Sequence, residues 1–305
     1  MIQCSARESE PDKETAMTKK SGELSPSLHP APAGNLATGW LKLIALFFMF
    51  IDHTGKVLFN NCYEMRVLGR IAFPIYIWCM IVGFHRTRSV PKYLIRILLV
   101  GFLSQPLYAL ALNTEGHIGT LLHTINAPLA AGFTFTGLRD VLYAIFLQKP
   151  NIFLTLFLGL CALWGIREKK FLSQFWAPVA AIILATALKA DYGWKGVLAF
   201  ILMYAVQGSR PGIAAVMTAY FLFWGSSYNV TSSLFGVEIN LNSLPNWLSG
   251  PLQAFMRLEA YGILSMPFLL IRFPGDIRMP KWLGYSLYPA HLVLILILKW
   301  IRFGW

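Results

Sequence analysis

Long apolar runs recur along the chain from about residue 40 to its end, and each is roughly the 20 residues that a helix needs to cross a bilayer. Backbone groups inside lipid must form their hydrogen bonds within the same segment, so these runs are predicted to be helices. A transmembrane barrel would instead show short segments of alternating polarity, and none are visible in the sequence. The sequence therefore predicts an all-α, polytopic transmembrane helix bundle with no soluble domain.

We predict about nine spans, within a range of eight to eleven, because the apolar runs have the required length. Residues 1–39 are polar and rich in Ser, Pro, Lys and Glu, which predicts a disordered cytoplasmic tail before a transmembrane domain at 40–305. The segment 113–147 is broken by glycines and Pro128, and is either a loop with a re-entrant or interfacial helix or a pair of short helices. The predicted spans are 40–59, 67–84, 93–112, 148–166, 174–190, 192–207, 211–229, 251–271 and 283–303.

Composition and charge agree with a membrane protein. Of 305 residues, 56% are hydrophobic and 13% are charged, against roughly 25% charged in soluble domains. The net charge of +12 comes from basic residues in short loops, so it predicts contact with membrane lipid rather than a nucleic-acid partner. The four cysteines form no Cys-x-x-Cys or Cys/His cluster, so neither a metal site nor a disulfide framework is predicted.

The loop charges also predict an orientation, because basic residues favour the cytoplasmic side. Ten basic residues lie in the loops of one side and four in the loops of the other, which places the amino terminus in the cytoplasm. We expect the membrane to be the inner membrane of a bacterium. With nine spans the carboxyl terminus would lie outside. The ten are Arg86, Arg88, Lys92, Arg167, Lys169, Lys170, Arg210, Arg272, Arg278 and Lys281, and the four are Arg66, Arg139, Lys189 and Lys195.

Ionisable residues inside a span cost about 2.5–3.5 kcal/mol each on insertion scales, so they indicate a function or a pairing. The first predicted span has four, Lys42, Asp52, His53 and Lys56. Lys42 and His53 are eleven residues apart and share a helix face. Asp52 can reach Lys56 one turn later as an ion pair, whereas His53 can titrate near neutral pH and is a candidate general base. The alternative is a polar helix end that contacts lipid headgroups.

Three further sites have both a structural and a chemical interpretation. Arg70 could pair with Asp52 across the short 60–66 connection or bind an anionic acyl donor. Arg96 follows Arg86 and Arg88, and this basic cluster could bind the phosphates of coenzyme A or only set the topology. His291 lies about half-way along the last span and is either a buried core residue or a second candidate base. The turn Asp191-Tyr192-Gly193 is explained by turn chemistry alone.

In their order and spacing, several motifs resemble the TraX family of conjugative plasmids and bacterial chromosomes. The resemblance covers most of residues 40–300. Its motifs are Leu41-Lys42-x-x-Ala45 with Asp52-His53, Gly69-Arg70-Ile71-Ala72-Phe73-Pro74, Tyr93-x-x-Arg96, Ser104-Gln105-Pro106, Asn151-x-x-x-Thr155-Leu156-x-Leu158-Gly159-Leu160, Asp191-Tyr192-Gly193-x-x-Gly196 and Tyr288-Pro289-x-His291.

The resemblance implies an acetyltransferase that moves an acetyl group from cytosolic acetyl-CoA to an amine or hydroxyl, such as the amino terminus of a pilin subunit. His53 would be the base, with Asp52 tuning it or holding Lys56 or Arg70, and Arg70 or Lys42 could stabilise the oxyanion. Arg96, Arg86 and Arg88 are the candidates for the CoA phosphates, Lys42 is a fourth candidate for binding the cofactor, and His291 is the competing base. Two alternatives stay open, a proton-coupled transporter and a non-catalytic pilus assembly factor.

One geometric difficulty accompanies this interpretation. The predicted topology places His53 nearer the outer face, whereas CoA approaches from the cytoplasm. Three solutions are open: the pantetheine arm of the donor reaches through the bundle, His291 mediates the transfer, or the first span is misplaced.

Overall fold

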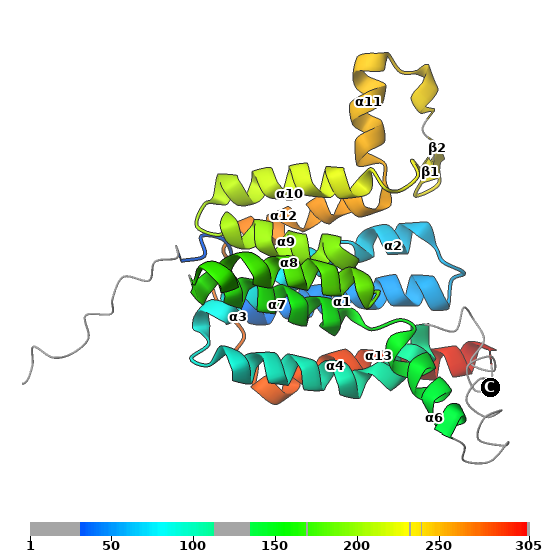
Figure 1. Cartoon of the computed structure of the whole chain (residues 1–305). Helices are drawn as coiled ribbons and strands as arrows, with labels where there is room; N and C mark the ends of the chain where they lie inside the picture. Colours follow the sequence, from blue (N-terminus) through cyan, green and yellow to red (C-terminus); the bar gives the residue numbers. More distant parts are fainter. Residues whose placement is uncertain (1–30, 113–134, 169, 232, 239, 304–305) are drawn as a thin grey trace, which may run out of the picture. The chain divides into compact units, whose positions relative to one another are not determined.

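A computed structural model describes residues 31–112, 135–168, 170–231, 233–238 and 240–303. It is mostly helical, and most of its helices follow the predicted apolar runs. The span predicted at 251–271 is instead divided among the helical segments Asn246–Phe255, Leu258–Ser265 and Met266–Leu270. The long helices lie side by side in Figure 1. They are α1 (Thr38–Val57), α3 (Ala72–Arg86), α4 (Val90–Leu112), α7 (Ile152–Glu168), α8 (Phe171–Ala187), α9 (Gly193–Ala205), α10 (Arg210–Gly225) and α13 (Lys281–Phe303).

Shorter elements connect the long helices. The helical ones are α2 (Tyr63–Gly69), α6 (Phe135–Leu142), the π-helix η2 (Tyr143–Leu147), the 3-10 helices η3 (Leu241–Ser243) and η4 (Leu258–Ser265), α11 (Asn246–Phe255) and α12 (Met266–Leu270). Strands β1 (Ser233–Leu234) and β2 (Val237–Glu238) form one antiparallel pair in which Ser233 lies opposite Glu238. Helix α11 stands away from the long helices in Figure 1, and none of its residues is buried.

Within the described residues, three helices are long and apolar enough to cross a membrane, namely Tyr63–Arg86, Val90–Leu112 and Trp282–Phe303. Leu138–Leu147 and Ile152–Glu168 meet at 66° and would make a fourth if they form one bent span. The structure thus supports a helical membrane protein with three or four such spans. The count of about nine and the lack of a soluble domain stay predictions.

Helix α3 forms the centre of the bundle, because it is apolar on all sides. Trp78 and Phe84 on α3 are fully buried, and Phe200 of α9 and Phe221 of α10 belong to the same core. Helix α8 is the opposite case: its buried residues are Ala181 and Ala185, while large side chains such as Phe175 are exposed.

Four of the basic residues predicted on the cytoplasmic side lie at one end of the bundle. Arg210 and Arg272 both donate to the carbonyl of Ala33, at 3.2 Å each. Arg86 donates to the carbonyl of Leu36, and Arg167 to that of Phe84. These contacts place the positive charges on one side, as the loop count predicts, and we call this side the basic end.

The segment just before α1, predicted as part of the tail, is packed against the bundle where it is described. Asn35 is fully buried, and its amide donates to the carbonyl of Phe268. Trp78 in turn donates to the carbonyl of Asn35. The predicted tail at 1–30 and the ambiguous segment at 113–134 lie outside the described residues.

Candidate functional site

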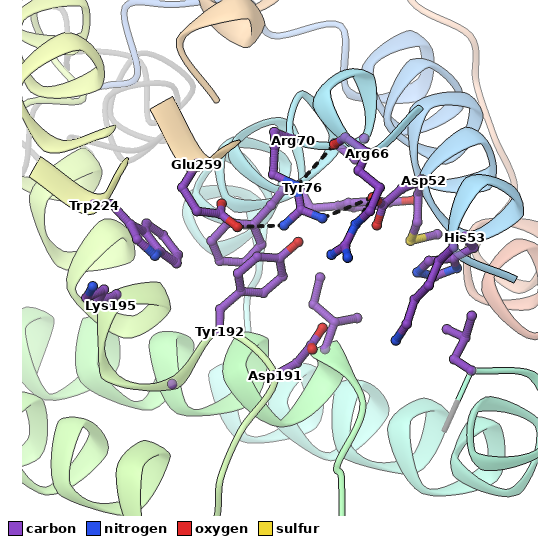
Figure 2. Close-up of a pocket in the computed structure, with 18 of the residues that line it drawn as sticks. Asp52, His53, Arg66, Arg70, Tyr76, Asp191, Tyr192, Lys195, Trp224 and Glu259 are labelled. Carbon is purple, nitrogen blue, oxygen red and sulfur yellow. Dashed lines mark hydrogen bonds and ion pairs between the residues drawn. The ribbon is translucent and has the colours of Figure 1, made fainter. Parts of the chain in front are cut away.

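A cavity of about 560 Å³ opens where α1 ends, at the opposite end from the basic end. We call it the His53 cavity. Its wall combines ionisable and aromatic side chains from distant parts of the chain, many of which Figure 2 labels. They include Asp52, His53, Lys56, Arg66, Arg70, Tyr76, Asp191, Tyr192, Lys195, Trp224, Tyr228, Glu259 and Tyr288.

The guanidinium of Arg70 forms the centre of a buried charge network in this wall. Its Nη2 lies 3.0 Å from Oδ1 of Asp52, and its Nη1 lies 2.7 Å from Oε1 of Glu259. Nε donates to the backbone carbonyl of Arg66. Arg70 and Glu259 are only 7% and 4% exposed, so this network is held within the protein rather than in water. The predicted pair of Arg70 with Asp52 is confirmed, and Figure 2 shows Arg70 between its two carboxylates.

Gly69 allows this network to form. A Cβ atom added there would lie 2.2 Å from Cβ of Asp52, so α2 can approach α1 this closely only with glycine. The approach brings two arginines to Asp52, since Nε of Arg66 also lies 3.6 Å from its carboxylate. The predicted pair of Asp52 with Lys56 is therefore wrong: Arg66 and Arg70 of the neighbouring helix take that place.

His53 and His291 are in direct contact. Nδ1 of His53 lies 3.1 Å from Nε2 of His291, and their rings are stacked at 25°. One ring must donate and the other accept, because a neutral imidazole has one of each. His53 lines the cavity, whereas His291 is 5% exposed and lies behind it. The two residues predicted as competing bases thus form one pair, with His53 facing the cavity.

Of the four residues predicted to bind CoA, none lies in the His53 cavity. Arg86 and Arg88 are exposed at the basic end, and Arg96 is half-buried on the first turns of α4. Lys42 lies nearly three turns before His53 on α1, in a second cavity described below. The structure brings together Asp52, Arg70 and the two histidines, and leaves the predicted phosphate-binding residues elsewhere.

Sequence reasoning missed Trp224 and Glu259 of this cavity, and it explained the turn with Asp191 and Tyr192 by turn chemistry alone. Tyr192 stacks on Phe73 with ring centroids 3.8 Å apart and meets Trp224 edge-on. Asp191 lines the cavity beside it, and the turn that carries both bends at Gly193, which has φ +54°. For Glu259 a signal existed, because a glutamate within the predicted span 251–271 carries the same insertion cost as Asp52.

Within the described residues, no group of three His, Cys, Asp or Glu side chains could hold a metal ion. The groups of the site that can take part in chemistry or binding are the histidine pair, the charge network and the aromatic wall.

Comparison with known proteins shows a family match that covers the residues of this site. The TraX protein family matches residues 37–299, a range that includes every residue of the histidine pair and the charge network. The chain belongs to the TraX family. It is 27% identical over 267 residues to a probable fimbrial assembly protein FimC, serogroup H1, of Dichelobacter nodosus, covering 84% of this chain and 92% of that protein.

A second relative is the uncharacterized protein RP591 of Rickettsia prowazekii (strain Madrid E). It is 23% identical over 267 residues, which cover 86% of this chain and 90% of the relative. No solved structure matches the chain. The family and the name of the Dichelobacter relative support a membrane protein with a role related to pili.

Proposed function

We propose that this TraX-family chain is an integral membrane acetyltransferase, which moves an acetyl group from acetyl-CoA to an amine or hydroxyl. The observation that carries this proposal is the histidine pair, in which only His53 faces the cavity. A base must lie within hydrogen-bond reach of the proton that it removes. His53 meets this requirement for an acceptor in the cavity, because its Nδ1 is occupied by His291 and its Nε2 is left for the acceptor.

The reaction follows from this arrangement. Nε2 of His53 takes the proton of the acceptor as its nitrogen or oxygen attacks the thioester carbonyl. The C–S bond then breaks, and the CoA thiolate receives the proton from the imidazolium. His291 accepts at its Nε2 from the Nδ1–H of His53, which holds the His53 ring in one orientation and in the tautomer whose Nε2 can take a proton, as the partner of a catalytic histidine does in other acyl transfers.

Arg70 has a positioning role in this proposal. Its guanidinium is already bound to Asp52, Glu259 and a backbone carbonyl, so few donors remain for an oxyanion or an acyl donor. The fixed charges hold α1, α2 and η4 together beside His53. We therefore assign the binding of the acceptor to the other wall of the cavity, where Asp191, Tyr192 and Trp224 lie.

The Dichelobacter relative suggests which acceptor to test. Its name describes assembly of a fimbria, so we propose that the acceptor is a subunit of a surface fibre, such as the amino terminus of a pilin. The cavity would receive it at the end of the bundle opposite the basic end. We further propose that the basic end faces the cytoplasm of a bacterial inner membrane, with the amino terminus inside and the acceptor outside.

The same name also favours a second candidate, a non-catalytic assembly factor. Transfer of radiolabelled acetyl from acetyl-CoA, in membranes with equal amounts of protein, separates the two. The acetyltransferase predicts label on a membrane acceptor with wild type and none with His53→Ala. His85→Ala is the matched control, since His85 pairs with Gln207 at 2.6 Å near the basic end and lines neither cavity. Fibre assembly that persists in His53→Ala without any labelling would support the assembly factor.

A further inference from the structure

A second cavity of about 160 Å³ lies between α1, α3, α4, α7 and α13, and we call it the Lys42 cavity. Lys42 and Leu46 line it from α1, Cys79 from α3 and Tyr93 from α4. Lys42 lies on the part of α1 nearest the basic end. This cavity therefore extends from the side of the basic end into the interior of the bundle.

The two cavities share part of their walls. Met49, Tyr76, Ile152 and Tyr288 line both the Lys42 cavity and the His53 cavity. Eleven residues of helix separate Lys42 from His53, a rise of about 16 Å along α1 at 1.5 Å per residue. A narrow, extended chain that entered beside Lys42 would thus reach the histidine pair once these four side chains let it pass.

Tyr288 provides an independent sign of a ligand at this junction. Its ring is 6% exposed, and its hydroxyl is buried with no hydrogen-bond partner within the described residues. A buried hydroxyl that has lost its water partners and gained none in the protein is destabilising. The ring lies 4.9 Å from that of His291 and meets Phe153 edge-on at 4.7 Å, so packing holds it at this place. An oxygen atom of a bound molecule would satisfy the hydroxyl.

We propose that the Lys42 cavity holds the acyl-pantetheine arm of the donor, and that the Tyr288 hydroxyl donates to the thioester carbonyl oxygen at its tip. This inference rests on the proposed acetyltransfer. The acceptor in the His53 cavity loses its proton to His53 as it forms a bond to the carbonyl carbon. The negative charge that develops on the carbonyl oxygen is stabilised by Tyr288, and the C–S bond then breaks to release CoA on the side of Lys42. The two substrates thus meet from opposite cavities.

Cys79 allows a direct test, because it lines the Lys42 cavity and is a free thiol. Full-length protein in which Cys4, Cys62 and Cys161 are serine is treated with the pyridyl disulfide of CoA. Thiol exchange would join CoA to Cys79 and release pyridinethione, and excess acetyl-CoA should slow this labelling at least tenfold. Protein that retains only Cys161 is the matched control, since Cys161 is partly buried on α7 and lines neither cavity.

Two further variants keep the test decisive. Leu46→Cys, in protein without the native cysteines, provides a thiol on the other wall of the cavity if Cys79 does not react with the reagent. Acetyl-CoA should slow labelling of this thiol to the same extent. Tyr288→Phe should lower acetyl transfer about 100-fold, as loss of an oxyanion donor does, while capture of CoA at Cys79 continues. Its control is Tyr204→Phe, because Tyr204 is also buried, lies on α9 and lines neither cavity.

Each result has one meaning. One outcome is that acetyl is transferred while acetyl-CoA protects neither Cys79 nor the thiol at position 46, or while a fatty acid protects them instead. In that case the cavity does not hold the donor, and this inference is wrong although the proposed acetyl transfer stands. If acetyl-CoA protects both thiols but no acceptor is labelled, the cavity binds the donor and the proposed transfer fails. Protection with full activity in Tyr288→Phe would overturn the role of that hydroxyl.

Discussion

Asp52 and His53 are neighbours on α1 and both line the same cavity, yet their surroundings differ in kind. Asp52 shares Arg70 with Glu259 and is also approached by Arg66, so its charge is neutralised inside the protein. His53 has one imidazole partner and leaves its second nitrogen toward the cavity. Polar groups thus have two uses in this apolar bundle: a network of opposite charges holds helices together, whereas a histidine with one free nitrogen is available for chemistry.

The largest expected effect on activity belongs to the histidine side of this comparison. His53→Ala removes the proposed base and should lower acetyl transfer by about 10²–10⁴-fold. Its unfolding temperature in detergent should change little, because His53 takes no part in the charge network. Activity close to that of wild type, in protein of equal abundance, would show that His53 is not the base.

On the side of the charge network, Arg70→Ala should act mainly on stability. It leaves two carboxylates in the protein without their common partner, which costs about 3–5 kcal/mol for a buried pair. Arg70→Lys keeps the charge but not the bidentate geometry of the guanidinium, so its loss of stability should be smaller. Thermal unfolding, followed by the loss of soluble protein, ranks wild type, Arg70→Lys and Arg70→Ala by stability. A stability unchanged in Arg70→Ala would mean that the network does not hold the helices together.

Gly69→Ala tests the close approach on which the network depends. The added methyl would lie 2.2 Å from Cβ of Asp52, so the helices must separate, at a cost of about 1–3 kcal/mol for an overpacked site. Gly250→Ala is the control, because nothing lies within 4 Å of the added atom in α11. The same unfolding assay should find Gly69→Ala less stable and Gly250→Ala at least as stable as wild type.

The smallest effect is expected for His291→Ala. It removes one neutral hydrogen bond from His53, worth about 0.5–1.5 kcal/mol, and should lower the rate about two- to tenfold. Initial rates of acetyl transfer at saturating acetyl-CoA measure it. A loss larger than that of His53→Ala would reverse the roles of the two histidines.

Much of the fold could be predicted from local sequence, because the length of an apolar run decides where a membrane helix lies. The run predicted at 40–59 corresponds to α1, and the run at 93–112 to α4, which begins at Val90. The pairing of Asp52 with Arg70 could also be predicted, since only a short connection separates the two helices. The number of spans could not, because several helices are shorter than a bilayer requires.

The rest of the site depends on contacts between distant parts of the chain. Glu259 lies 189 residues from Arg70, and His291 lies 238 residues from His53. Helical periodicity places a residue on a face but does not say which helix that face meets. For this reason the sequence presented the two histidines as rivals, whereas the structure makes them a pair. The predicted phosphate-binding arginines lie apart from His53, and their role stays a prediction.

The most direct test of the account compares acetyl transfer by wild type, His53→Ala, His291→Ala and the double variant, at matched protein levels. If the two histidines act as one unit with His53 facing the acceptor, the double variant should be no slower than His53→Ala alone. His291→Ala should lie between these and wild type. Equal and additive losses from the two substitutions, or full activity in the double variant, would contradict the central role of the pair.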